Sequence, residues 1–278
     1  DAIMAQARRG EPLSANVIDM HAHILDEGLE GGGERYTMWN GGPTGVRRLA
    51  ERIGVDRIGV MSWNGTVGTQ AEAGNACVKS ALDAHPDFYW GLATFDVMHC
   101  DATQMRAQME QLFADPRFLG LKPYPKYGIP YDDPRYDVWW QFGSERRLYC
   151  GLHPVNWYQP GELDSVCSRF PDLKVVAFHA GASYPIADTC IELARKHRNF
   201  FAEITFSSIP LGIIDYLVEG VGADRVLYGS DLPMRDPRPQ LGWVIYSRLN
   251  EADKRAVLGE NAKRFLSEIR TTREDIVE

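Results

Sequence analysis

Eight short apolar runs, separated by longer amphipathic stretches, constrain the fold of this chain more than any other feature. The runs are nearly continuous in hydrophobic residues, as expected of strands that are covered on both faces. They lie at residues 16–23, 56–63, 88–96, 118–124, 148–155, 173–181, 200–206 and 225–231. Each run therefore predicts a buried strand of a parallel sheet.

The stretches between the runs carry helical spacing. In one of them Val46, Leu49, Ala50 and Ile53 recur every three to four positions, which predicts an amphipathic helix over 44–55. Asp101 is a candidate N-cap of another helix. Further helices are predicted at 69–86, 101–116, 136–147, 161–171, 184–198, 209–222 and 250–269.

This strict alternation predicts an α/β fold, a (β/α)8 TIM barrel. Eight units in 278 residues match the size of that barrel, and strand–helix–strand units imply a parallel sheet with right-handed crossovers. We expect residues 1–278 to form a single domain with the barrel at 16–269. The alternative is a doubly wound open sheet, which usually has fewer strands, and we see no phosphate-binding glycine loop after the first run.

The connection at 25–43 is long, rich in glycine and without periodicity. Loops of this length are uncommon in compact domains and are often functional. The connection follows the first predicted strand, and active sites of such barrels lie at the carboxyl ends of the strands. It is therefore either a lid over an active site or a disordered insertion.

Composition excludes several classes of partner. The net charge is −8 and no run of Lys or Arg stands out, which argues against a nucleic-acid surface. No stretch is long and apolar enough to span a membrane, and the first residues lack the apolar region of a signal peptide. The five cysteines are scattered and odd in number, which favours a reducing compartment. We expect a cytoplasmic enzyme with a small-molecule substrate.

An assembly of identical chains is a further expectation for this protein. Trp139 and Trp140 are adjacent in a predicted helix. They belong either to the core or to an interface between copies of the chain.

Polar residues stand at the ends of several predicted strands. His21 and His23 share one face of the first strand, because alternate residues of a strand point the same way. His153, His179 and Asp231 end the fifth, sixth and eighth strands. In a barrel these strand ends converge at one mouth. Two imidazoles there can bind one divalent cation, and the alternative is a pair of histidines hydrogen-bonded in a polar loop.

Two further charged residues lie on predicted strands. Lys122 ends the fourth predicted strand, and three roles are open for it. It binds an anionic substrate, it is carboxylated and bridges two metals, or it extends to solvent. Glu203 lies in the seventh, either facing the site or making a structural ion pair.

Aromatic and cationic residues follow several strands and would surround the mouth. The predicted substrate-binding residues are Lys122, Tyr124, Asn156, Trp157 and Arg235. Cations beside aromatic rings suit a small, flat substrate that bears a carboxylate. The alternative for each residue is the ordinary composition of a loop.

Six segments together resemble the amidohydrolase superfamily, and more closely its amidohydrolase-2 family. They read "DMHAH", "GLKPYP", "GLHPVN", "VVAFHAGASYP", "DRVLYGSDLP" and "VLGENAKRFL", occur in the family's order and cover nearly the whole chain. Any one of them is weakly specific, whereas the set is strongly so. The resemblance implies a distorted (β/α)8 barrel with a metal centre.

The resemblance also implies roles for individual residues. His21, His23, His153 and Asp231 would be metal ligands, with Asp231 also catalytic as the base for water. His179 would be the general acid/base or would support the ligands. Zinc is the first choice for a nitrogen-rich ligand set, and manganese is the alternative.

The family includes hydrolases of amides and lactones as well as non-oxidative decarboxylases. The sequence favours a metal-dependent hydrolase that uses an activated water to attack a C–N or C–O bond. The alternative is a metal-dependent decarboxylase of a small aromatic or unsaturated acid. A third reading, an inert barrel that binds a ligand, fits poorly with ligand-type residues at the ends of several strands.

Overall fold

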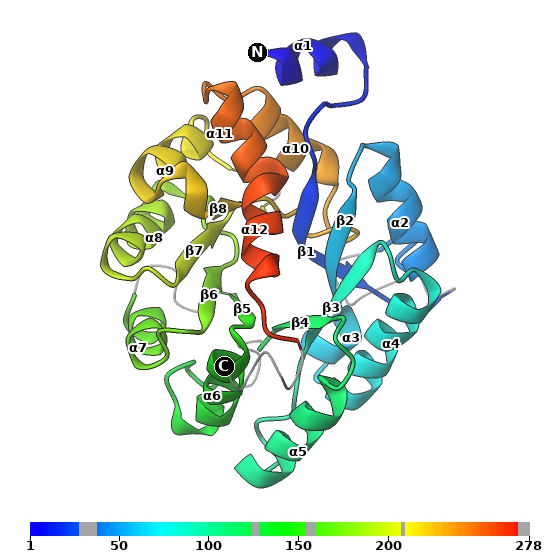
Figure 1. The fold of residues 1–278 in the computed structure, drawn as a ribbon, viewed down its shortest axis with the longest axis vertical. Coiled ribbons are helices and arrows are strands. Elements are labelled where there is room, and N and C mark those ends of the chain that lie inside the picture. The colour runs from blue at the N-terminus through cyan, green and yellow to red at the C-terminus, as the bar shows by residue number, and fades with distance from the viewer. Residues whose placement is uncertain (28–37, 124–127, 154–159, 207–208, 272–278) are drawn as a thin grey trace.

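One parallel sheet, whose strands follow the order of the chain, forms the centre of the fold (Figure 1). A computed structural model describes residues 1–27, 38–123, 128–153, 160–206 and 209–271. Its strands are β1 (Ile18–Ile24), β2 (Arg57–Ser62), β3 (Tyr89–Ala93), β4 (Phe118–Leu121), β5 (Tyr149–Leu152), β6 (Lys174–Ala177), β7 (Phe200–Glu203) and β8 (Val226–Leu227). All the predicted strands are therefore present, and each pairs in parallel with the next.

The sheet meets itself through the end of β8 and the segment that follows. The backbone N–H of Met20 in β1 donates to the carbonyl of Tyr228 at 2.9 Å. Ala22 forms a parallel bridge with Leu232. With helices surrounding the strands, the chain forms a single-domain (β/α)8 barrel, which confirms the predicted fold class.

Helices follow the strands along the chain, as the apolar spacing predicts. They are α2 (Pro43–Arg52), α4 (Ala71–Ala84), α5 (Ala102–Leu112), α6 (Asp137–Arg146), α7 (Gly161–Arg169), α8 (Tyr184–Lys196), α9 (Ile213–Val221), α11 (Glu251–Arg255) and α12 (Asn261–Ser267). Asp101 caps α5, because its carboxylate accepts from the N–H of Gln104 at 2.8 Å and the Gln104 side chain accepts from the N–H of Asp101 at 3.1 Å. The predicted N-cap is confirmed.

Several helical segments escape the sequence prediction. They are α1 (Ala2–Arg9), α3 (Trp63–Thr66), α10 (Pro237–Ile245) and the short η2 (Pro134–Tyr136) and η3 (Ala223–Arg225). The helix predicted at 250–269 is present, but a π-helical turn, η4 (Ala256–Glu260), interrupts it between α11 and α12. α10 has little apolar periodicity, yet it begins with an N-cap, Asp236, followed by Pro237 in the first turn. That pair is a helix-start signal, since proline lacks an N–H that the first turn leaves unbonded anyway.

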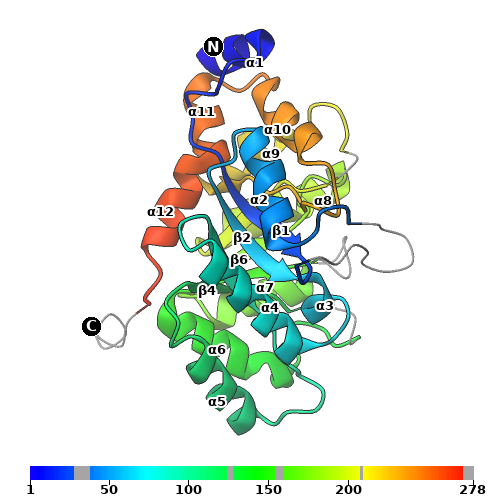
Figure 2. The same cartoon turned by 90° about the vertical axis from the view of Figure 1, so that its right-hand side faces the viewer.

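Helix α12 closes the end of the barrel from which the strands start. The Phe265 ring lies 5.6 Å from Tyr149 at the start of β5 and 4.8 Å from Phe201 in β7. The ammonium of Lys174, the first residue of β6, donates to the Phe265 carbonyl at 3.0 Å. In Figure 2 the arrow of β1 points away from α12. The opposite, carboxyl end of the strands is therefore left for a site.

Burial decides between the two sequence alternatives for the adjacent tryptophans. Trp139 and Trp140 of α6 are 1% and 0% exposed, so this pair belongs to the core. All the cysteines are unpaired thiols, and four of them are buried like small apolar side chains. Most of the predicted lid, residues 28–37, lies outside the described residues. Among the described helices, none combines the length and the apolar character that crossing a bilayer requires.

Candidate active site

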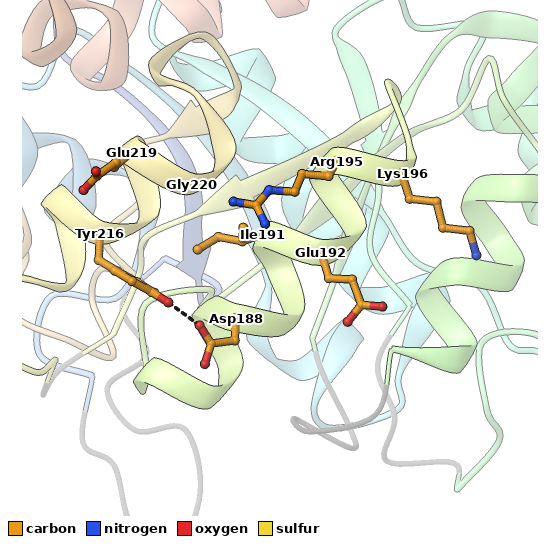
Figure 3. Close-up of a pocket in the computed structure, with 8 residues that line it drawn as sticks. All are labelled: Asp188, Ile191, Glu192, Arg195, Lys196, Tyr216, Glu219 and Gly220. Atoms are coloured by element: carbon orange, nitrogen blue, oxygen red, sulfur yellow. Dashed lines mark hydrogen bonds between the residues drawn. The ribbon is translucent and has the colours of Figure 1, made fainter.

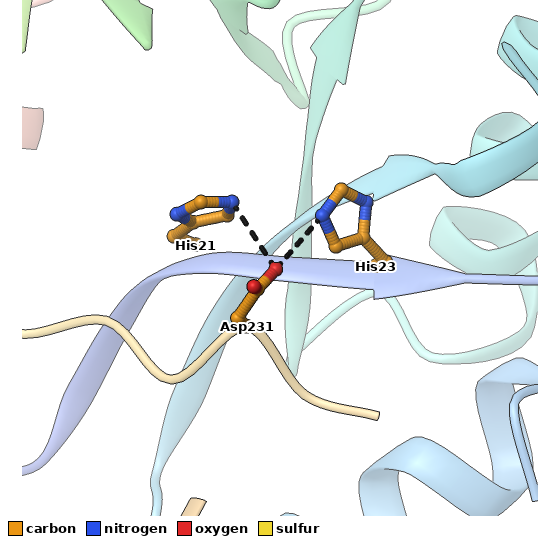
Figure 4. A group of neighbouring side chains, drawn as sticks. All are labelled: His21, His23 and Asp231. Carbon is orange, nitrogen blue, oxygen red and sulfur yellow. Dashed lines mark ion pairs between the residues drawn. The ribbon is translucent and has the colours of Figure 1, made fainter. Parts of the chain in front are cut away.

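Two imidazoles and one carboxylate converge at the carboxyl end of β1 (Figure 4). The Nε2 atom of His23 lies 3.0 Å from Oδ1 of Asp231, and Nε2 of His21 lies 3.5 Å from the same oxygen. The three side chains come from β1 and from the segment after β8, and all are buried. The structure therefore brings together three of the four predicted ligands.

The chemistry of this group fits a divalent cation. Ligand atoms of His21, His23 and Asp231 lie within 4.8 Å of one another. Oδ1 of Asp231 is buried and, among the described residues, receives no hydrogen bond, although two imidazole nitrogens face it. Two imidazole nitrogens and a carboxylate oxygen that converge in this way match the ligand preferences of zinc and related ions.

A buried carboxylate that the sequence analysis did not assign fixes the backbone beside these ligands. Asp19 of β1 accepts hydrogen bonds from the backbone N–H of His21 and of Ser230, both at 3.0 Å, and from the Ser230 hydroxyl. Burial raises the pKa of its carboxyl to about 7. An acid inside an apolar strand needs such partners. The position of Asp19 in the apolar run at 16–23 was therefore the sequence signal that could have indicated its structural role.

Glu203, at the end of β7, lies behind His21. Its Oε2 is 3.2 Å from Nδ1 of His21, and the side chain is fully buried. Burial raises the pKa of this carboxyl to about 8. The sequence left a site role and a structural role open for Glu203, and the structure places it against a predicted ligand.

His179 follows β6 with a positive φ of 64°, a backbone conformation that is uncommon for a residue with a side chain. Its Nδ1 lies 2.9 Å from the carbonyl of Thr205. A carbonyl only accepts, so Nδ1 carries the proton and Nε2 keeps a lone pair. Burial lowers the pKa of His179 to about 4, so the ring is neutral at pH 7.

His153, the fourth predicted ligand, follows β5 beside His179. Their ring centroids are 4.7 Å apart. The Tyr131 hydroxyl donates to the His153 carbonyl at 2.7 Å, which holds the backbone at this point. Burial also lowers the pKa values of His153 and His21 well below the usual range. Neutral imidazole is the form that binds metals.

Asp231 also has a positive φ, of 61°, and its N–H donates to the His21 carbonyl at 2.8 Å. Burial by itself raises the pKa of the Asp231 carboxyl. The adjacent His23 ring, with His179 and Arg235, more than offsets this effect and holds the pKa below its usual value. Asp231 is therefore ionised at neutral pH.

Lys122 lies just after β4 with only 1% of its surface exposed. Its ammonium lies 4.5 Å from the centre of the Phe178 ring, and Phe178 stacks on His21 with centroids 3.9 Å apart. Burial lowers the pKa of Lys122 to about 8, partly opposed by the nearby Asp231. The sequence alternative of a lysine extending to solvent is wrong, because the side chain is buried near the ligands.

The remaining predicted substrate-binding residues are placed less completely. Tyr124, Asn156 and Trp157 lie outside the described residues. Arg235 is half-buried and lines an outer cleft with Trp39 and residues of α2 and α10.

A second hollow lies between α8 and α9, on the outside of the barrel (Figure 3). It is lined by side chains of both charges, and the Tyr216 hydroxyl donates to Asp188 at 2.5 Å. None of the predicted site residues lines it. The strand ends, rather than this hollow, therefore carry the candidate chemistry.

Comparisons with known proteins agree with the fold. A curated relative, the gamma-resorcylate decarboxylase of Polaromonas sp. (strain JS666), is 24% identical over 165 residues. The match covers 50% of this chain and 48% of the relative, so the chain matches about half the length of that protein.

Two solved structures share the fold at low sequence identity. One is a dihydroxybenzoic acid decarboxylase from Polaromonas sp. with bound manganese and the inhibitor 2-nitroresorcinol (TM-score 0.66, 15% identity, 94% of this chain and 99% of that one). The other is a putative amidohydrolase from Staphylococcus aureus (TM-score 0.71, 15% identity, 91% of this chain and 99% of that one). At such identity, the two structures show the fold alone.

The amidohydrolase family model matches residues 18–267, which include every strand and every predicted ligand. The chain therefore belongs to the amidohydrolase-2 family, as the resemblance of its sequence segments indicates.

Proposed function

We propose that the chain is a metal-dependent decarboxylase that removes the carboxylate of a small hydroxylated aromatic acid without oxidation. The observation that carries the proposal is the buried His21–His23–Asp231 group with the cationic Lys122 nearby. A cation site beside an ammonium suits an anionic substrate. The decarboxylase relatives named above support this choice over the hydrolysis that the sequence favours.

The residues that would hold the cation are His21, His23 and Asp231, with His153 as a proposed fourth ligand. When bound, a divalent ion would neutralise negative charge on the substrate and orient its oxygens. Zinc follows from the nitrogen-rich ligand set, and manganese is supported by its presence in the dihydroxybenzoic acid decarboxylase.

The chain's own groups divide the remaining tasks of decarboxylation. Lys122 binds the carboxylate of the substrate through its ammonium. The C–CO2 bond breaks, CO2 leaves, and the electron pair that stays on the ring carbon takes up a proton. Asp231, ionised in the free protein, first accepts a proton from water or a substrate hydroxyl and then donates it to that carbon. His179 offers the lone pair of Nε2 to a substrate hydroxyl.

Hydrolysis of a lactone or amide is the second candidate function. It is favoured by the lowered pKa of Asp231, because an ionised carboxylate can take the proton of an attacking water at neutral pH. In that case Lys122 would bind a carboxylate of the substrate that takes no part in the reaction and remains in the product.

A substrate panel separates the two functions. The protein, loaded with zinc or manganese, is incubated in D2O with hydroxybenzoates, lactones and amides, while CO2 and ring-opened or cleaved products are measured. Decarboxylation predicts CO2 together with deuterium on the carbon that lost it. Hydrolysis products without CO2 would overturn the leading proposal in favour of the second. If the protein neither turns over any of these substrates nor binds metal, the third interpretation, an inert barrel that binds a ligand, would remain.

A further inference from the structure

Glu203 is a fully buried carboxylate at the end of β7, where the chain has to neutralise or hydrogen-bond it. The part of the chain that the structure describes gives it four polar contacts. Its Oε1 accepts from the N–H of Thr205 at 2.6 Å and from the Thr205 hydroxyl, and its Oε2 accepts from the N–H of His179 at 3.3 Å. The fourth contact is the 3.2 Å approach of Oε2 to Nδ1 of His21.

The backbone after β8 leaves room for this carboxylate. A Cβ atom on Gly229 would lie 2.2 Å from Oε1 of Glu203, so only glycine fits there. Glu203 therefore contacts β1, the end of β6 and the segment after β8, and these three elements carry His21, His179 and Asp231. One buried side chain therefore links two elements that hold proposed ligands with the element that holds His179.

The position of Oε2 decides what His21 can do. His21 faces Asp231 with Nε2 and Glu203 with Nδ1. An imidazole that gives its Nε2 lone pair to a cation carries its proton on Nδ1, and that proton needs an acceptor when the ring is buried. Oε2 of Glu203 is placed to be this acceptor.

We propose that Glu203 is a positioning residue, which accepts the Nδ1 proton of His21 and thereby aims Nε2 at the cation. His21, His179 and Glu203 also lie close enough to form a ligand group of their own. The donors from Thr205 and His179 already occupy both oxygens of Glu203, so a support role fits better than a second cation site.

The test compares Glu203→Gln with a matched variant, Asp19→Asn. Both changes turn a fully buried carboxylate near β1 into an amide. Among the described residues, however, the hydrogen-bond partners of Asp19 are backbone N–H groups and a hydroxyl, without an imidazole, and Asn keeps the Oδ1 atom that accepts from both N–H groups. Zinc affinity is measured by competition with a chelating dye. We expect Glu203→Gln to weaken zinc binding by about 10- to 100-fold, the usual effect of losing such a partner, and Asp19→Asn by less than about threefold.

A spectroscopic readout distinguishes positioning from general damage. In the zinc-loaded protein, the Nδ1 proton of His21 should give a protected resonance in spectra of 15N-histidine-labelled protein, identified by its loss in His21→Asn. Glu203→Gln should shift this resonance or expose it to exchange, whereas Asp19→Asn should retain it. If Glu203→Gln does not fold, Thr205→Val removes the hydroxyl donor to Glu203 and should weaken zinc binding in the same direction.

The inference rests on the proposed metal-dependent function, and the same experiments separate their failures. A wild-type protein that binds neither zinc nor manganese overturns the proposed function. If the wild type binds zinc, two results overturn the role of Glu203 and leave the proposed function standing. One is a Glu203→Gln variant with unchanged zinc affinity and an unchanged His21 resonance. The other is an equal loss of zinc affinity in Glu203→Gln and Asp19→Asn.

Discussion

At the scale of single residues, the proposed function assigns cation binding and substrate binding to different groups of the site. Asp231 lies between two imidazoles, while Lys122 lies over Phe178. Asp231→Asn should therefore abolish tight zinc binding and lower turnover by at least about a thousandfold, since it removes both a ligand and the proton carrier. Zinc titration and steady-state kinetics measure the two effects.

Lys122→Gln is the matched comparison for that prediction. It should keep zinc affinity and raise KM for carboxylate substrates by about 10- to 100-fold, because a buried ionic contact is lost. If Lys122→Gln lost zinc binding while Asp231→Asn kept it, the assignment of cation binding to Asp231 and of substrate binding to Lys122 would be contradicted.

The raised pKa of Glu203 predicts how stability depends on pH. Its ordinary value is 4.5 and burial raises it to about 8, so the folded, metal-free protein holds a proton that the unfolded chain releases between these values. The contribution to stability is complete below pH 4.5, declines as pH rises and is lost above about pH 8. The slope reaches at most about 1.4 kcal/mol per pH unit.

Urea denaturation of the metal-free protein at pH 5, 7 and 9 measures this slope. Glu203→Gln cannot titrate, so the stability difference between wild type and variant should shrink or reverse as pH rises. A difference that stays constant over this range would show that the carboxyl does not titrate in the window.

At the scale of elements, close packing behind the strand ends supports the ligands. A Cβ atom on Gly151 of β5 would lie 2.2 Å from the Phe178 ring, which stacks on His21. Gly151→Ala should cost about 1–3 kcal/mol of stability by overpacking, and it should also weaken zinc binding by displacing Phe178.

Gly242 in α10 provides the control for Gly151. Nothing lies within 4 Å of a Cβ atom built there, so Gly242→Ala should stabilise the helix by about 0.5–1 kcal/mol without changing zinc affinity. Urea denaturation and dye competition on both variants check the pair. Equal behaviour of the two would mean that the Gly151–Phe178 contact does not support the site.

Prediction from sequence succeeded for elements with strong periodicity and failed for those with weak periodicity. All the strands and the helices between them were found because apolar runs and spacing determine them. Apolar spacing did not predict α10, because this helix begins with a cap and a proline but has little apolar periodicity. The helix at 250–269 was predicted, but not its π-helical turn η4, because apolar spacing does not distinguish a single π-helical turn within a helix.

At the scale of the whole molecule, the cation should couple to folding, because its proposed ligands come from the two ends of the sequence. His21 and Asp231 meet only in the folded barrel. Chelation should therefore lower the Tm, and zinc at about 100 times its Kd should add about 2.7 kcal/mol to the stability. Differential scanning calorimetry with and without chelator measures this, and His23→Ala should abolish the response.

The assembly of identical chains and the cytoplasmic location stay predictions. Assembly of identical copies is measurable by sedimentation, and a cytoplasmic location by fractionation of cells. Neither follows from the fold, because barrels of this type present many different outer surfaces.

The sequence alone determined the class of fold and the residue types of the site. Apolar runs require burial on both faces, eight of them close a barrel, and polar residues at the strand ends then meet at one mouth. Tertiary structure decided which of these residues touch. The register of β1 against the end of β8 sets the approach of Asp231 to His21 and His23, and burial among neighbours sets the pKa values of Lys122 and Glu203. Such contacts join residues that are far apart in the sequence, and the local spacing of residue types does not determine the distances between them in the fold.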